Sequence, residues 1–188
     1  ENSYYWVVTF FAVACGVGIS VPVDKELTDE EISALFTKAD AQAVFFSRTY
    51  YKTVQKHMAA DERCKLGVCL NKEYDDENIT TIEKLIEKGK QLIKNGDRAY
   101  LDATVDKDDL AAIVFTSGTT GANKGVMLSH YNFSVTVDGV LETIDPDQYS
   151  SISLLPMNHV YEFTCNILTA LYMNCVIYVN DSLKNFMN

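Results

Sequence analysis

Apolar, β-branched runs recur along this chain and alternate with segments of helical periodicity. The runs cover residues 19–23, 43–46, 66–70, 111–116, 152–155 and 176–179. Several are apolar throughout rather than at every second position, which is typical of strands that are covered on both faces. Strands that alternate with helices favour right-handed βαβ crossovers. The sequence therefore predicts an α/β fold, with a mainly parallel sheet and helices on both of its faces.

Polar caps mark the starts of two helices. Thr28 and Glu31 have the spacing of a capping box, and Thr80 and Glu83 repeat it. The apolar residues of the second helix fall on one stripe, which consists of Ile82, Leu85, Ile86, Leu92 and Ile93. An Asn-Gly pair at residues 95–96 predicts the end of that helix. The polar segments 73–78 and 97–109 are expected to be exposed connections.

Residues 4–23 carry no charge and are numerous enough to span a membrane. Gly16, Gly18 and Pro22 interrupt this stretch, and no basic segment precedes it. This pattern favours a buried helix followed by a core strand over a membrane span or a signal peptide. Trp6, inside the apolar run, is expected to pack in the core.

The bulk composition argues against nucleic acid as a partner and indicates a cytoplasmic protein. The net charge of −10 argues against nucleic acid, because no basic surface is available to release counterions. The five cysteines lack the pairwise spacing of zinc ligands and are expected to be reduced, mostly buried thiols in a cytoplasmic protein. They are Cys15, Cys64, Cys69, Cys165 and Cys175.

The segment 115–130, FTSGTTGANKGVMLSH, directly follows one of the predicted strands. Its hydroxyls and glycine N–H groups are donors suited to phosphate oxygens, and Lys124 adds a point charge. It is not a Walker A loop, because Lys124 precedes Gly125 instead of following a glycine. The pattern predicts a polyphosphate-binding loop. The candidate phosphate-binding residues are Thr116, Ser117, Gly118, Thr119, Thr120, Gly121, Lys124 and Gly125.

This ordered string resembles the phosphate-binding loop of the adenylate-forming superfamily, whose usual form is YTSGTTGxPKGVxLSH. The superfamily includes acyl-CoA synthetases, luciferase and peptide-synthetase adenylation domains. Residues 154–163, LLPMNHVYEF, are similar to its second core motif in long-chain fatty-acyl-CoA synthetases. Residues 3–46 and 77–93 also resemble early segments of the family. Asn123 departs from the pattern, because the family usually has a proline there, and its absence removes a constraint on φ.

The resemblance implies that residues 1–188 form part of the AMP-binding (adenylation) domain in the large N-terminal domain of such an enzyme. It implies a ligase that activates a long-chain fatty acid with ATP through an acyl-adenylate and then transfers the acyl group to coenzyme A. Mg²⁺ is expected with ATP, because an acidic chain repels the nucleotide, and salt screens that repulsion only beyond about 8 Å, so local groups and the metal ion must offset it at the site. The C-terminal remainder lies outside this chain. We therefore expect the fragment alone to be inactive, and no metal ligand is assigned within it.

His159 follows Pro156 at the end of a predicted strand, where ligands of open α/β sheets collect. The resemblance implies that it forms a wall of the site where the carboxylate meets the α-phosphate, with a role in positioning rather than proton transfer. Tyr161 either borders the acyl pocket or packs. Glu162 either caps the helix or orients His159.

Two further histidines have structural interpretations. Ser129 and His130 are interpreted as the N-cap region of a helix over residues 131–144. His57, in a polar helical stretch, is expected to be solvated.

Several functional alternatives remain open at this point. The acceptor thiol could belong to an acyl carrier protein, and the acid could be shorter or aromatic. A flavodoxin-like FMN carrier also uses a Ser/Thr/Gly loop, but there the loop follows the first strand. A non-catalytic relative is a further alternative. The expected partners are small molecules, with peripheral membrane contact for acyl delivery, in a cytoplasmic or membrane-associated protein.

Overall fold

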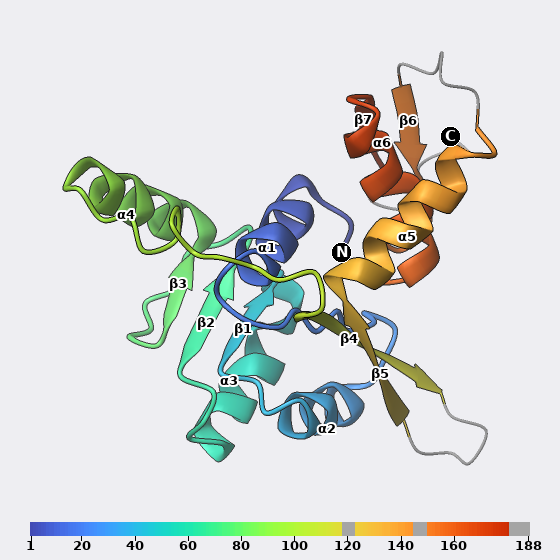
Figure 1. The fold of residues 1–188 in the computed structure, drawn as a ribbon. Coiled ribbons are helices and arrows are strands. Elements are labelled where there is room, and N and C mark those ends of the chain that lie inside the picture. Colours follow the sequence, from blue (N-terminus) through green and yellow to red (C-terminus); the bar gives the residue numbers. More distant parts are fainter. Residues whose placement is uncertain (118–122, 145–149, 181–188) are drawn as a thin grey trace. The chain divides into compact units, whose positions relative to one another are not determined.

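The computed structural model describes residues 1–117, 123–144 and 150–180. The chain divides into two compact units. One unit consists of Glu1–Asp24 with Ala103–Asn188, and the other of Lys25–Asp102. Both units combine strands with helices (Figure 1), which confirms the predicted α/β class.

The unit Lys25–Asp102 is built on a three-stranded parallel sheet in the order β1-β2-β3 (Figure 1). Its strands are β1 (Ala43–Phe46), β2 (Leu66–Cys69) and β3 (Ile79–Thr81). Its helices are α2 (Asp29–Lys38), the 3₁₀ turn η1 (Arg48–Tyr50), α3 (Tyr51–Ala60) and α4 (Ile82–Lys94). Its core contains Val44, Phe46, Val54, Cys64, Cys69 and Ile79.

The helix caps of this unit confirm one prediction and correct another. The hydroxyl of Thr28 accepts from the Glu31 N–H, and the Glu31 carboxylate accepts from the Thr28 N–H at 2.9 Å, so α2 begins as predicted. The capping box expected at Thr80 is wrong. Strand β3 continues through Thr81, whose hydroxyl caps α4 by accepting from the Lys84 N–H at 3.2 Å. Asn95 is the C-cap, as predicted.

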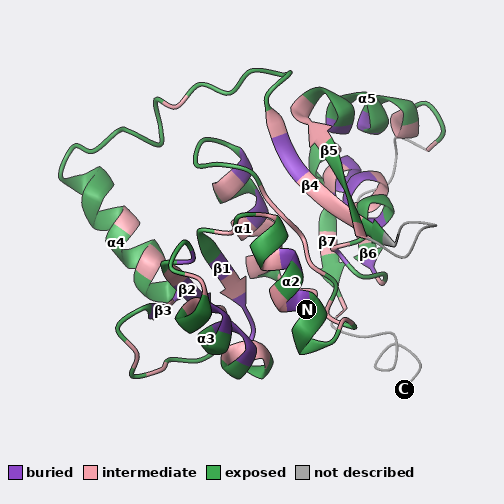
Figure 2. Cartoon of the chain, turned by 90° about the horizontal axis from the view of Figure 1, so that it is seen from below, coloured by how far each residue is buried: buried purple, intermediate pink, exposed green. Residues whose placement is uncertain are grey.

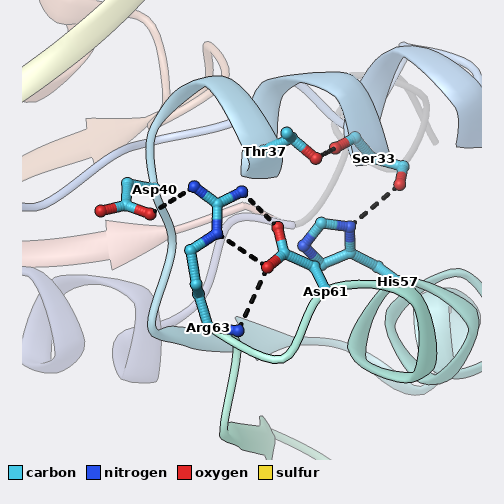
Figure 3. A network of polar contacts seen from close by, with 6 residues as sticks. All are labelled: Ser33, Thr37, Asp40, His57, Asp61 and Arg63. Atoms are coloured by element: carbon cyan, nitrogen blue, oxygen red, sulfur yellow. Dashed lines mark hydrogen bonds and ion pairs between the residues drawn. The ribbon is translucent and has the colours of Figure 1, made fainter.

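His57 is buried between α2 and α3, so the expectation that it is solvated is wrong. It is 3% exposed, and its Nδ1 lies 3.0 Å from the hydroxyl of Ser33 (Figure 3). The ring of Phe36 packs edge-on against it. Burial lowers the pKa of His57, while neighbouring Asp61 opposes and Arg63 reinforces that shift.

A second part of the same network lies at the C-terminal end of α3 (Figure 3). The Arg63 guanidinium donates to both carboxylate oxygens of Asp61, at 2.8 and 2.6 Å, and to Asp40 at 2.7 Å. These hydrogen bonds from Arg63 lower the pKa of Asp61 to about 2.

The lowered pKa values of His57 and Asp61 predict two separate losses of stability in acid. The pKa of His57 is lower in the folded protein than in the unfolded chain, where it is near 6.5. The unfolded state therefore binds the proton first, and the stability falls as the pH drops below about 6.5. Asp61 contributes stability above its ordinary pKa of 3.8, and that contribution is lost as the pH falls towards about 2. Urea unfolding between pH 8 and pH 2 measures both. The His57→Gln variant should lose the first dependence, at most about 1.4 kcal/mol per pH unit, and keep the second. An unchanged slope near pH 6 in that variant would contradict the assignment to His57.

The other unit contains the candidate functional residues. Its N-terminal helix is α1 (Tyr4–Ala14). Its middle elements are β4 (Leu110–Ser117), β5 (Asn123–Ser129) and α5 (His130–Leu141). Its later elements are β6 (Ser150–Ser153), the π-helix η2 (Glu162–Leu168), α6 (Thr169–Tyr172) and β7 (Val176–Val179). Strands β4 and β5 pair antiparallel, and β6 and β7 pair parallel.

Helix α1 packs through an aromatic cluster, as expected for a buried helix. Phe10 is 6% exposed and contacts Phe163 and Phe133, while Trp6 is partly buried against the same cluster. The buried stretch of β4 belongs to this core (Figure 2). The strand expected at residues 19–23 is reduced to a single bridge between Ser20 and Ala112. None of the helices in the described residues is long and apolar enough to cross a membrane.

All five cysteines carry free thiols. Cys64 and Cys69 are buried, Cys165 and Cys175 are partly buried, and Cys15 is exposed. The sequence of residues 182–188, SLKNFMN, also predicts the start of a helix, and these residues lie outside the described ones.

Candidate functional site

Strands β4 and β5 bring the two ends of the predicted phosphate loop together. In their antiparallel register Thr116 lies opposite Lys124, and Ser117 lies opposite Asn123. Directly opposed residues of an antiparallel pair have neighbouring side chains. Thr116 and Lys124 are both exposed. The hairpin therefore places Thr116, which carries a hydroxyl, directly opposite Lys124, which carries an ammonium group, at the base of the glycine-rich segment.

The middle of the predicted loop lies outside the described residues. It contains Gly118, Thr119, Thr120 and Gly121, which fall within residues 118–122. Lys124 and Gly125 were expected in a loop, but they lie in strand β5. Pairing with β4 extends the strand to Asn123, so the segment between the two strands is shorter than the motif.

Gly125 has a packing reason to be glycine. A Cβ at this position would lie 2.9 Å from Cγ2 of Ile113 and 3.3 Å from Cε1 of Phe115, its cross-strand partner. The first distance is shorter than real Cβ contacts allow, so any side chain here would require Ile113 or the backbone beside it to shift. The glycine therefore permits close pairing of the strands that carry Thr116 and Lys124.

Helix α5 follows β5 directly. The hydroxyl of Ser129 accepts from the Asn132 N–H at 3.3 Å, and the Asn132 side chain accepts from the Ser129 N–H at 2.9 Å. This reciprocal cap confirms Ser129 as the N-cap, with His130 as the first helical residue. The described helix ends at Leu141, three residues before the predicted end.

His159 lies in the turn after β6 and is exposed. Its Nδ1 lies 3.3 Å from the backbone nitrogen of Tyr161. Because a backbone N–H only donates, Nδ1 accepts, and the proton of the neutral ring is on Nε2. His159 therefore presents an N–H donor, which suits a carboxylate or phosphate oxygen.

Glu162 is 4% exposed and begins the π-helix η2. Its Oε1 accepts from the side-chain amide of Asn166 at 2.8 Å. The hydrogen-bond partner that the structure gives the Glu162 carboxylate is thus Asn166 and not His159. Asn166 was not anticipated, because an asparagine within an apolar helical pattern carries no distinguishing signal in the sequence.

Tyr161 is 60% exposed and lines a cavity of about 270 Å³ between α5 and the start of η2. The other lining residues are Leu128, Asn132, Phe133, Thr136, Val160, Thr164 and Cys165. Thr164 is 2% exposed, and its hydroxyl has no hydrogen-bond partner among the described atoms. The cavity is mostly apolar with a few polar groups, as small-molecule sites usually are.

Packing between α5 and η2 connects the two groups of candidate residues. Phe133 of α5 and Phe163 of η2 meet edge-on, with ring centroids 5.9 Å apart. Helix α5 continues from the strand that carries Lys124, and η2 continues from the turn that carries His159. Both motifs therefore belong to one packed unit.

Comparison with known proteins places this arrangement in a wider context. A family model described as AMP-binding enzyme matches residues 1–187. A peroxisomal long-chain acyl-CoA synthetase of Arabidopsis thaliana is 28% identical over 169 residues, covering 86% of this chain and 24% of the relative. A chloroplastic long-chain-fatty-acid–acyl-carrier-protein ligase of the same plant is 36% identical over 108 residues, covering 53% of this chain and 14% of the relative. The chain thus matches a quarter or less of the length of these relatives.

Solved structures share the fold at lower sequence identity. ATP-bound MatB from Rhodopseudomonas palustris superposes with a TM-score of 0.72 at 22% identity, covering 97% of this chain and 34% of that protein. The anthranilate CoA ligase AuaEII, in complex with anthranoyl-AMP, has a TM-score of 0.78 at 16% identity, covering 95% of this chain and 33% of that protein.

Proposed function

Because the chain belongs to the AMP-binding enzyme family, we propose that the whole protein activates a long-chain fatty acid with MgATP and transfers the acyl group to coenzyme A. In the first step a carboxylate oxygen attacks the α-phosphorus, and pyrophosphate leaves. In the second step the thiol sulfur attacks the acyl carbonyl, and AMP leaves. Long-chain acyl-CoA synthetases among the relatives support this substrate class. Family membership sets aside the FMN-carrier alternative.

The observation that carries the proposal is the cross-strand pairing of Thr116 with Lys124. The pair presents a hydroxyl donor and a cation at the base of the glycine-rich segment, in a chain whose net charge is −10. A local cradle is needed here, because the overall charge repels a polyphosphate. We assign the β- and γ-phosphates to this pair together with Ser117, residues 118–121 and the backbone of Gly125. Positioning and charge neutralisation would then supply most of the catalysis.

We assign the fatty-acid substrate to the turn that carries His159. The Nε2–H of His159 would donate to the fatty-acid carboxylate and orient it, without transferring a proton. The cavity lined by Tyr161 has the apolar surface that an acyl chain requires. Glu162 has a supporting role, because its carboxylate is buried and bonded to Asn166.

A second candidate acceptor has its own support. The relative with 36% identity is named as a ligase that uses acyl carrier protein. In that alternative the adenylation step is the same, and the acceptor thiol belongs to a carrier protein.

Acid-dependent ATP–pyrophosphate exchange by the whole protein tests the adenylation step. We expect exchange with palmitate, weaker exchange with octanoate and benzoate, and no exchange after Mg²⁺ is chelated. Thioester formation is then compared with coenzyme A and with holo-acyl carrier protein, and we expect coenzyme A to be preferred. Absence of exchange with every acid would refute the proposed activity, whereas a preference for the carrier protein would change only the acceptor.

A further inference from the structure

The backbone that leads from β6 to His159 is held by two asparagine side chains that come from distant parts of the chain. Asn2 precedes α1, and Asn166 lies within η2. Each uses its amide as both donor and acceptor. An asparagine amide offers two N–H donors and an oxygen acceptor, so one side chain can hold several backbone groups at once.

Asn2 holds the turn itself. Its Nδ2 donates to the carbonyl of Leu155 at 2.8 Å, and its Oδ1 accepts from the N–H of Met157 at 2.9 Å. These two groups lie on either side of Pro156, which has no N–H to donate and whose carbonyl accepts from the His159 N–H at 3.0 Å. The amide of Asn2 thus fixes the backbone on both sides of Pro156. The side chain of Met157, 1% exposed, anchors the same turn in the core.

Asn166 holds the strand before the turn to the helix after it. Its Nδ2 donates to the Ile152 carbonyl at 3.0 Å and to the Glu162 carboxylate at 2.8 Å. Its Oδ1 accepts from the hydroxyl of Ser151. Because the carbonyl and the carboxylate only accept, the amide nitrogen must face them. Asn166 therefore joins β6 to the first residue of η2, and the His159 turn lies between these two points.

We propose that Asn2 and Asn166 are positioning residues that hold His159 in the orientation it needs to contact the substrate. The inference rests on the function proposed above. His159 is exposed and has no core packing of its own to fix it, so its placement depends on the backbone on either side. Groups that orient a substrate need support of this kind, because a small displacement costs a large factor in rate.

Asn166→Asp is the sharpest test, because it keeps the shape and removes both donors. It places a carboxylate against the Glu162 carboxylate and the Ile152 carbonyl. We expect the maximal rate of palmitate-dependent pyrophosphate exchange in the whole protein to fall at least tenfold, with the KM for ATP unchanged within twofold. Asn95→Asp, an exposed helix C-cap in the other unit, makes the same change of charge and should retain full activity.

A double-mutant cycle with His159→Ala separates positioning from general destabilisation. If Asn166 acts through His159, adding Asn166→Asp to the His159→Ala variant should lower the rate by a further factor of less than two. An equal loss in both backgrounds, or no loss from His159→Ala, would overturn the inference. If Asn166→Asp fails to fold, Ser151→Ala, which removes one contact of Asn166, takes its place in the cycle with an expected threefold loss.

Imidazole ¹⁵N spectra of the whole protein test the positioning of His159 independently of the proposed function. The His159 signals, identified by their loss in His159→Ala, should show the proton on Nε2. Asn166→Asp should shift these signals, and Asn95→Asp should leave them in place. If no acid supports exchange, the proposed function fails, and the spectra still decide whether Asn166 positions His159. Unshifted signals in Asn166→Asp would refute the positioning role.

Discussion

Replacing Lys124 with alanine is expected to lower acid-dependent pyrophosphate exchange of the whole protein by roughly ten- to a hundredfold. A hydrogen bond to a charged group contributes on the order of 1.5–3 kcal/mol, and about 1.4 kcal/mol corresponds to a tenfold change in rate. Lys124 is exposed in β5, where the strand pairing depends on backbone groups. The variant should therefore fold normally and lose activity through weaker contact with the phosphates.

Two variants make the Lys124 result specific. Lys88→Ala removes the same charge from an exposed position on α4 and should leave exchange unchanged. Lys124→Arg keeps the charge but changes the geometry, and an intermediate rate is expected. Exchange at the wild-type rate in Lys124→Ala would exclude this lysine from the phosphate site.

Replacing Phe163 with alanine is expected to lower the free energy of unfolding by about 3–5 kcal/mol. Phe163 is 3% exposed, and its ring centroid lies 4.2 Å from that of Phe10 and 5.1 Å from that of Trp6. The substitution leaves a cavity where α1, α5 and η2 meet. Because the Phe163 N–H also donates to the His159 carbonyl at 3.1 Å, loosening this helix should disturb the candidate site as well.

Denaturant unfolding of the whole protein measures the effect of Phe163→Ala. Phe163→Leu keeps much of the apolar volume and should cost clearly less. Tyr172→Ala removes a ring that is 71% exposed and should cost well under 1 kcal/mol. Similar losses for Phe163→Ala and Tyr172→Ala would contradict the assignment of Phe163 to the core of this unit.

The elements with strong local signals were predicted closely. The apolar runs at 43–46 and 176–179 coincide with β1 and β7. Two strands were missed for different reasons. Strand β3 is only three residues long, and β5 lies within a segment whose glycine and polar residues are typical of a loop. Both form because a neighbouring strand supplies their hydrogen bonds, and no pattern local to the segment reports that neighbour.

The candidate site was predictable in part. The residue types and order in 115–130 indicated phosphate chemistry, and the turn before His159 was expected at the end of a strand. The pairing of Thr116 with Lys124 depends on the register between β4 and β5. The roles of Asn2 and Asn166 depend on contacts across more than ten residues of chain, and in the case of Asn2 across more than 150.

The sequence by itself determined the α/β class, the helix caps at Thr28 and Ser129, and the family to which the chain belongs, because each depends on residues close together in the chain. Only the tertiary structure decided that His57 is buried and which groups hold His159. Burial and long-range hydrogen bonds depend on which elements meet when the chain packs, and that choice is made by all of their surfaces together.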